Sequence, residues 1–344
     1  MKNKVSTFLT RATALALFAA PFCSINAQEV YSATIGAVAI KVPSQSDVMV
    51  ALPFKQEKAA GGSVSSVDAA VATLGASTLP DGEYGASGHY LYVEDGSLQG
   101  RHFDIVSNTP STVTLDASDL TGLAGANISI RKHWTLDALF PEGVGYHEET
   151  EPGRRVVEVV LPEAASEGGG LAVAKIYYFF EDTWREFGKA IDESNDAGGT
   201  VVQPGEAFVV RNNGGTDLDY FFFGEVEYGP LAIPLQSSSD VVDNFVAVGR
   251  PLGLKIEELG LHTNPSVFGA NDRLLVYPNG QQGLLGSDLK PTVYLYASDK
   301  WQVEGGDGTN VGGTLIEAGQ GIAVRKAADA AGTEYWVNDW SISQ

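Results

Sequence analysis

The sequence predicts a mainly β protein made of two related antiparallel β-sandwich or barrel-like modules, the first enlarged by a small β insertion. Three observations lead to this prediction: apolar residues alternate with polar ones in short runs, turn residues separate the runs, and one sequence pattern occurs twice. Helical signals are confined to residues 134–139 and 254–259, which are too short to dominate a fold.

The N-terminal residues 1–27 have the layout of a secretory signal peptide. Lys2, Lys4 and Arg11 precede a short apolar run, and Ala27 closes a segment suited to cleavage. The run is shorter than the roughly 18 residues of a membrane helix, although a retained N-terminal anchor is the alternative. We expect export through the secretory pathway to the periplasm, the cell surface or the medium, with no transmembrane segment after cleavage.

Composition excludes several kinds of chemistry. The single cysteine, Cys23, lies in the signal segment, so the mature chain has no disulfide and no thiolate nucleophile or metal ligand. The chain has 43 acidic and 22 basic residues and a net charge of −21. A negative field of this size disfavours nucleic acid and anionic lipid as partners.

The repeated pattern is clearest in its tail. The stretch GGTVVQPGEAFVVR at 198–211 returns as GGTLIEAGQGIAVR at 312–325. Within each copy, two apolar residues, a turn and a second apolar run predict a strand, a tight turn and a strand, with Gly205 and Gly319 at positive φ.

Two further matches precede the tail in the same order. Residues 177–184 (YYFFEDTW) match 294–301 (YLYASDKW), and 40–48 match 233–241, which aligns Asp47 with Asp240. We expect Trp184 and Trp301 to fill equivalent cores, and Asp182 and Asp299 to cap equivalent turns through side-chain bonds to the backbone. The duplication places module 1 at 28–232 and module 2 at 233–344.

Module 1 contains an insertion, because the heads of the two copies lie farther apart in sequence than their tails. The inserted subdomain is placed at about 61–132. Its opening, GGSVSSVDAAVATLGAS, is predicted to be a linker or a poorly packed segment. The following residues alternate apolar and polar side chains between turn signals, as in short strands.

Several segments together resemble a known family. These are IKVPSQSDVMVALPF, GRHFDIVSNTPSTVTL, RKHWTLDALFPEG and the tail W…GGT…PGEAFVVR, behind a signal peptide. The combination resembles a family of exported, β-rich bacterial proteins described only as conserved and uncharacterised. The resemblance implies common descent, and it transfers no catalytic residue.

The loops before the two Gly-Gly pairs contain matching acidic and amide side chains, which raises a calcium hypothesis. Calcium takes oxygen ligands, and glycine lets backbone carbonyls approach an ion. The candidate ligands are Asp192, Glu193, Asp196, Asp307 and Asn310. The alternative is an ordinary solvated acidic loop, and no other cofactor is expected.

Trp336 and Trp340 are the candidate carbohydrate-binding residues. Aromatic faces stack on sugar rings, and the even spacing of these two residues places them on one face of a strand. The alternative is that both cover the end of a sheet.

The leading functional prediction is a non-enzymatic structural or interaction protein whose partner is a cell-surface glycan or an envelope protein. The chain has no H-E-x-x-H, G-x-S-x-G or P-loop motif. The alternatives are a polysaccharide-binding protein and a carbohydrate-active hydrolase. A binder predicts exposed aromatic side chains in a row, a hydrolase predicts one concave site with converging acids, and a structural role predicts neither.

Overall fold

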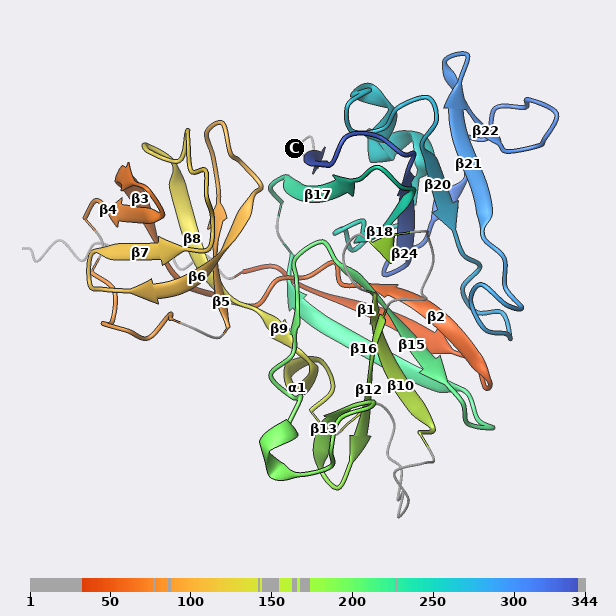
Figure 1. Cartoon of the computed structure of the whole chain (residues 1–344), viewed down its shortest axis with the longest axis horizontal. Helices are drawn as coiled ribbons and strands as arrows, with labels where there is room; N and C mark the ends of the chain where they lie inside the picture. The colour runs from red at the N-terminus through yellow and green to blue at the C-terminus, as the bar shows by residue number, and fades with distance from the viewer. Residues whose placement is uncertain are drawn as a thin grey trace, which may run out of the picture. The chain divides into compact units, whose positions relative to one another are not determined.

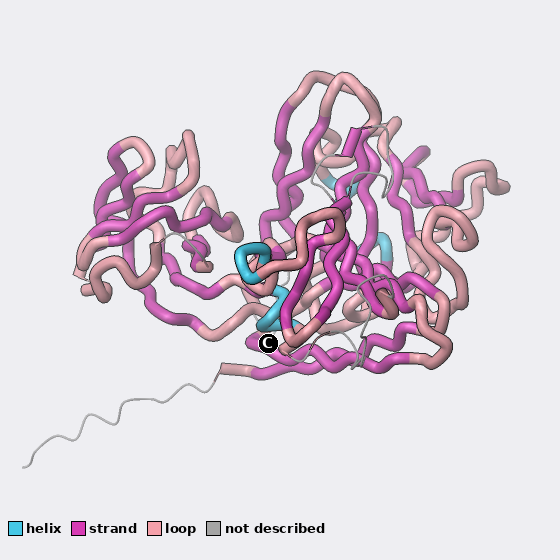
Figure 2. The backbone as a smooth tube through the Cα atoms, turned by 60° about the horizontal axis from the view of Figure 1, so that its bottom comes forward, coloured by secondary structure: helices cyan, strands magenta, loops and turns pink. Residues whose placement is uncertain are grey.

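The computed structural model describes residues 33–76, 78–85, 88–141, 143, 155–162, 166–167, 174–226 and 228–339. The predicted signal peptide and Trp340 lie outside these residues. Antiparallel strands and loops make up nearly all of the described chain, which confirms the mainly β prediction (Figures 1 and 2). No helix among the described residues is long and apolar enough to cross a membrane.

The strands of module 1 form a five-stranded sheet, a two-stranded ribbon and a short pair. The sheet has the order β13-β12-β10-β15-β2, the ribbon is β1-β16, and the pair is β14-β9. The bounds are β1 Ile35–Val42, β2 Ser46–Ala51, β9 Trp134–Thr135, β10 Val157–Pro162, β12 Ala174–Phe180, β13 Thr183–Glu186, β14 Val201–Val202, β15 Ala207–Asn212 and β16 Leu218–Glu225.

Module 2 repeats this arrangement. Its sheet has the order β11-β18-β24-β20-β21-β22, its ribbon is β17-β25, and its short pair is β19-β23. The bounds are β17 Leu231–Ser237, β18 Val242–Ala247, β19 Leu254–Lys255, β20 Arg273–Val276, β21 Thr292–Ala297, β22 Lys300–Val303, β23 Leu315–Ile316, β24 Gly321–Lys326 and β25 Gly332–Asn338. The extra edge strand, β11 (Ser166–Glu167), comes from the module 1 segment of the chain.

Helical structure is limited to single turns. These are α1 (Leu136–Leu139) and the 3₁₀ turns η1 (Glu193–Asn195), η2 (Ile256–Leu259) and η3 (Leu261–Thr263). The turns α1 and η2 follow the equivalent strands β9 and β19, so the two halves have the same order of elements as well as the same strand pairing. This correspondence supports the predicted duplication.

The structure corrects the predicted alignment of the heads. Arg211 and Arg325 occupy equivalent places near the ends of β15 and β24, and each forms a bidentate ion pair with a buried aspartate. The partner of Arg211 is Asp47, and the partner of Arg325 is Asp243. Asp240 lies instead in an exposed bend. Sequence similarity selected Asp240 because the loop before β18 is longer and contains Ser239-Asp240, which resembles Ser46-Asp47, whereas Asp243 follows a valine.

The repeated Gly-Gly-Thr segment has the same role in both halves. It runs beside the short helical turn, whose backbone N–H groups donate to its carbonyls. The four hydrogen bonds are Leu136 to Thr200, Asp137 to Gly198, Ile256 to Thr314 and Glu257 to Gly312. A Cβ at Gly198 or Gly312 would lie 2.2 or 2.8 Å from the carboxylate of the turn, so the Asp137 or Glu257 side chain would have to move to admit another residue.

The repeated turns contact the opposite module. Gly205 and Gly319 have φ of 85° and 77°, as predicted. The carbonyl of Gly319 accepts a hydrogen bond from Ala51 at the end of β2, and the carbonyl of Gly205 accepts one from Ala247 at the end of β18, both at 2.8 Å. The duplicated motif therefore joins the modules through two reciprocal contacts.

The insertion is a closed barrel of order β3-β4-β7-β6-β5-β8. Its strands are β3 Lys58–Asp68, β4 Val71–Leu74, β5 His89–Val93, β6 His102–Asn108, β7 Thr112–Leu115 and β8 Asn127–Lys132. The opening was predicted to be a linker or a poorly packed segment. It forms β3 and β4, so the linker alternative is wrong, although most side chains of β3 are exposed or half-buried. Two register shifts bend β3 so that it pairs with both β8 and β4, and its glycines and small residues permit this curvature.

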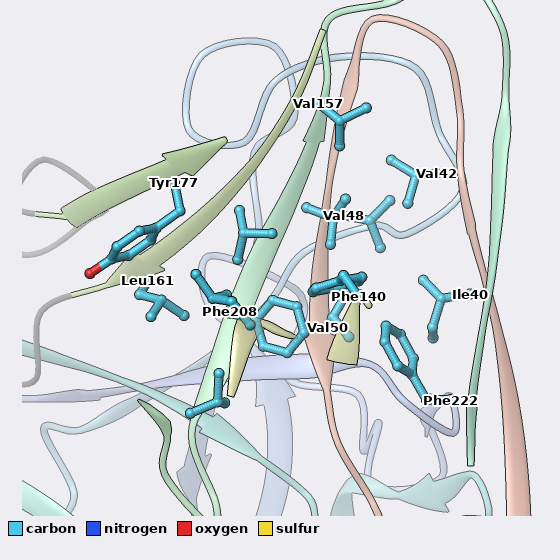
Figure 3. Packing of buried hydrophobic residues seen from close by; sticks show 14 of the residues in the cluster. Ile40, Val42, Val48, Val50, Phe140, Val157, Leu161, Tyr177, Phe208 and Phe222 are labelled. Atoms are coloured by element: carbon cyan, nitrogen blue, oxygen red, sulfur yellow. The ribbon is translucent and has the colours of Figure 1, made fainter. Parts of the chain in front are cut away.

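Each module and the barrel have a core of their own. Trp184 lies in the module 1 core at 0% exposure and Trp301 in the module 2 core at 1%, which confirms their predicted burial. Figure 3 shows side chains of β1, β2, β10, β15 and β16 meeting around Phe140, which follows α1. A further cluster, which includes Met49 and Phe245, fills the space between the sheets of the two modules.

The prediction that Asp182 and Asp299 cap their turns is wrong: within the described residues, neither side chain accepts a hydrogen bond from the backbone of its turn. Each occupies the second position of a two-residue hairpin loop, with φ of 57° and 58° after another residue of positive φ. Such turns match the twist of the flanking strands, and Asp tolerates the left-handed conformation better than most residues. Backbone conformation therefore explains the repeated aspartate.

Candidate functional site

The predicted carbohydrate site at the C-terminus is not formed by Trp336. This side chain is 2% exposed, packs in the module 2 core and donates its indole N–H to the Leu259 carbonyl at 2.9 Å. It cannot offer a face to a sugar ring, so the assignment of Trp336 is wrong. Even spacing on a strand fixes a shared face but not whether that face points inward.

The predicted calcium ligands do not converge. Asp192 accepts from Ser194 and Asn195, Asp196 accepts from the Gly198 N–H, Asp307 from the Thr309 N–H and Asn310 from the Gly312 N–H. Glu193 lies in η1 between Asp192 and Asp196.

Among the described residues, no group of three or more His, Cys, Asp or Glu side chains is placed to hold a metal ion. The aspartate and asparagine oxygens instead close local turns of their own loops. Turn formation therefore accounts for the recurring oxygens, and calcium binding stays a prediction.

A cavity of about 660 Å³ lies between the barrel, the turn of module 1 and the ribbon of module 2. A volume of this order is typical of small-molecule sites. Acidic, amide, basic and aromatic side chains share its wall. The lining side chains include Arg101, Asp104, Asp116, Asp119, Gln203, Glu206, Gln236, Phe245 and Tyr335.

Asp104 is an acid of the cavity wall whose carboxylate has two polar neighbours. His133 Nε2 lies 3.1 Å from its Oδ1, and Gln203 Nε2 donates to its Oδ2 at 3.1 Å. The interaction with His133 and the hydrogen bond from Gln203 lower the pKa of Asp104. In the same wall, burial lowers the pKa of His102 to about 4, so this imidazole is neutral at pH 7.

The pKa of Glu206 is shifted in the opposite direction to that of Asp104. Burial raises its pKa to about 7, although its Oε2 accepts the Gln203 N–H at 2.9 Å. The equivalent residue of module 2 is Gln320, whose Oε1 accepts the Glu317 N–H at 3.0 Å. The turn therefore needs only an acceptor at this position, and module 1 supplies it with an acid that lines the cavity.

The remaining walls combine a cation with apolar surface. The Arg101 guanidinium lies 3.8 Å from the ring centroid of Tyr335, a cation–π contact that links the barrel to β25.

Gln203 Oε1 is buried and has no hydrogen-bond partner among the described residues. Buried polar atoms are nearly always satisfied, so a ligand donor at this point would complete the site.

Sequence analysis did not find these residues. Asp104 belongs to the inserted barrel, Glu206 to the repeat and Tyr335 to the last strand, and only the tertiary structure brings them together. One signal was present: the repeated turn has Glu206 in one copy and Gln320 in the other, the kind of asymmetry expected when one copy has a further role.

No family model, curated protein or solved structure matches the chain. The resemblance to an uncharacterised exported family therefore stays a prediction.

Proposed function

We propose that the protein is an exported, non-enzymatic interaction protein that binds a carbohydrate in the cavity between the barrel and the two modules. The observation that carries the proposal is the composition of the cavity wall. Sugar hydroxyls both donate and accept hydrogen bonds, and Asp104, Gln203 and Gln236 offer both functions. Phe245 and Tyr335 supply aromatic surface for the C–H faces of a sugar ring.

Export is inferred from the N-terminal pattern, and the acidic charge is compatible with a neutral or cationic glycan. The buried repeat tryptophans account for stability rather than binding. A single ligand site formed between duplicated modules and an inserted barrel is also consistent with an interaction role, because domain junctions commonly bind ligands.

Glycan-array binding by the chain without residues 1–27 tests the proposal. We expect binding to a defined set of glycans, with at least a tenfold loss in Tyr335→Ala and in Asp116→Asn. The matched controls are Thr333→Ala and Glu334→Gln, which alter exposed residues of the same strand outside the cavity. Binding that is absent, or that is unaffected by both cavity variants, would show that the cavity is not a carbohydrate site.

One observation favours a carbohydrate-active hydrolase as the second candidate. Glycoside hydrolysis uses one protonated and one ionised carboxyl group, and Gln203 bridges such a pair, Glu206 and Asp104. The variant Glu206→Gln separates the two functions, since Gln320 shows that glutamine closes this turn. Cleavage of a bound glycan that stops in Glu206→Gln while binding persists would establish the hydrolase instead.

A further inference from the structure

The two ribbons have equivalent outer faces, and only one of them is covered. On the module 2 ribbon, Ala232 is 1% exposed and donates its N–H to the Gly100 carbonyl of the barrel at 3.0 Å. Arg101 of the barrel lies over Tyr335 on the same face. The barrel therefore covers part of the outer face of this ribbon, around Ala232 and Tyr335, and leaves Val337 exposed.

The corresponding face of the module 1 ribbon is bare in the described structure. Ile35, Phe221 and Phe223 point outward from β1 and β16 and are 65%, 62% and 58% exposed. Phe221 and Phe223 also border an apolar cavity of about 300 Å³, together with Trp134 and Leu139. Contiguous exposed apolar surface of this kind usually marks an interaction site.

The cross-strand register shows which partner fits this face. Ala37 lies opposite Phe223, Ala39 opposite Phe221, and Lys41 opposite Asp219. At these three levels, the small residues and the cation are on β1, whereas the large residues and the anion are on β16; Ile35 extends the apolar surface at the start of β1. All of these side chains apart from the two phenylalanines are small or charged, and all are exposed.

This arrangement is complementary to itself. When two such ribbons meet face to face about a twofold axis parallel to the strands, β1 of each copy lies over β16 of the other. Alanine then packs against phenylalanine at two levels, and lysine meets aspartate at the third. A self-complementary patch of this type is what an isologous dimer requires.

We propose that this face, formed by Ile35, Ala37, Ala39, Lys41, Asp219, Phe221 and Phe223, binds the same face of a second copy of the chain. The proposal is independent of the carbohydrate site. Two aromatic side chains per copy cover less than the roughly 1,200–2,000 Å² of a standard interface. The dimer is therefore weak and forms reversibly at micromolar or higher concentration.

Sedimentation velocity of the chain without residues 1–27 tests the proposal. We expect a shift from monomer to dimer between about 1 µM and about 500 µM. The double variant Phe221→Ser, Phe223→Ser should remain monomeric over this range. Val337→Ser is the matched control, because it changes an exposed apolar residue on the equivalent face of the module 2 ribbon and should leave the dimer intact.

Charge reversal provides a second test that leaves the cores untouched. Lys41 Nζ already pairs with Asp217 Oδ2 of the same chain at 2.9 Å, so the charges are swapped in an Asp217→Asn background. In that background, Lys41→Asp and Asp219→Lys should each weaken the dimer, and the combined swap should restore it. A wild-type chain that is monomeric at about 500 µM would overturn the proposal. So would a dimer that survives the double phenylalanine variant, or a combined charge swap that fails to recover association.

Discussion

The raised pKa of Glu206 makes a quantitative prediction about stability. An acid with a folded pKa of about 7 against an ordinary value of 4.5 holds its proton more tightly in the folded state. The stability contributed by this proton is complete below pH 4.5 and is lost as the pH rises through 7. Each unit of pKa difference is worth about 1.36 kcal/mol, so the loss is roughly 3 kcal/mol, and less where cavity water screens the charge.

Glu206→Gln removes this titration while keeping the acceptor for the Gln203 N–H, as Gln320 does in module 2. The free energy of unfolding of the variant minus that of the wild type should rise by about 2–3 kcal/mol between roughly pH 4 and pH 8. Urea denaturation followed by tryptophan fluorescence at several pH values measures this difference.

Taking the difference between variant and wild type removes the effect of His102, which is present in both proteins and acts in the opposite direction. Difference values that stay constant within about 0.5 kcal/mol across the range would refute the reasoning. That result would mean that Glu206 is well solvated in the cavity and titrates as an ordinary surface acid.

Three further predictions concern stability. The pKa of His102 is lowered from 6.5 to about 4, so stability falls as the pH drops through this window, and His102→Gln should flatten the fall measured by urea denaturation. Gly319→Ala should lower the free energy of unfolding by about 2–3 kcal/mol, because the φ of Gly319 is positive and the new Cβ would lie 2.7 Å from Ile40. Gly313→Ala is the control: its Cβ would have no atom within 4 Å, so the free energy of unfolding should fall far less in the same assay. Asp47→Asn and Asp243→Asn should each lower the free energy of unfolding by about 3 kcal/mol, because each removes the buried carboxylate that pairs with an arginine. Arg211 keeps a second carboxylate, Glu158, at 3.9 Å, so the loss in Asp47→Asn should not exceed that in Asp243→Asn. A loss in only one variant would contradict the equivalence of the two pairs.

The amino-acid sequence was sufficient for features that depend on local pattern. Alternation of apolar and polar residues predicted strands, because each strand of a half-buried sheet turns successive side chains to opposite faces. The glycines of the repeated turn were predicted correctly, because positive φ excludes most other residues. The repeated tryptophans also lie in equivalent cores, as their positions in the repeat indicated.

Features that depend on which strands become neighbours were decided by the tertiary structure. Trp336 faces the core because β25 pairs with β17, and its spacing from Trp340 carried no information on this point. The segment 61–76 looked like a linker because its residues are small, yet closure of the barrel gives its backbone hydrogen bonds on both sides.

The cavity depends on the tertiary structure more than any other feature of the protein. Asp104, Glu206 and Tyr335 lie in three different parts of the sequence, and only long-range pairing brings them together. The shifted pKa values of Asp104 and Glu206 likewise arise only from burial and contacts in the folded chain. Local sequence specifies the elements because backbone preferences act over a few residues. The site depends on burial, and burial is a property of the assembled chain.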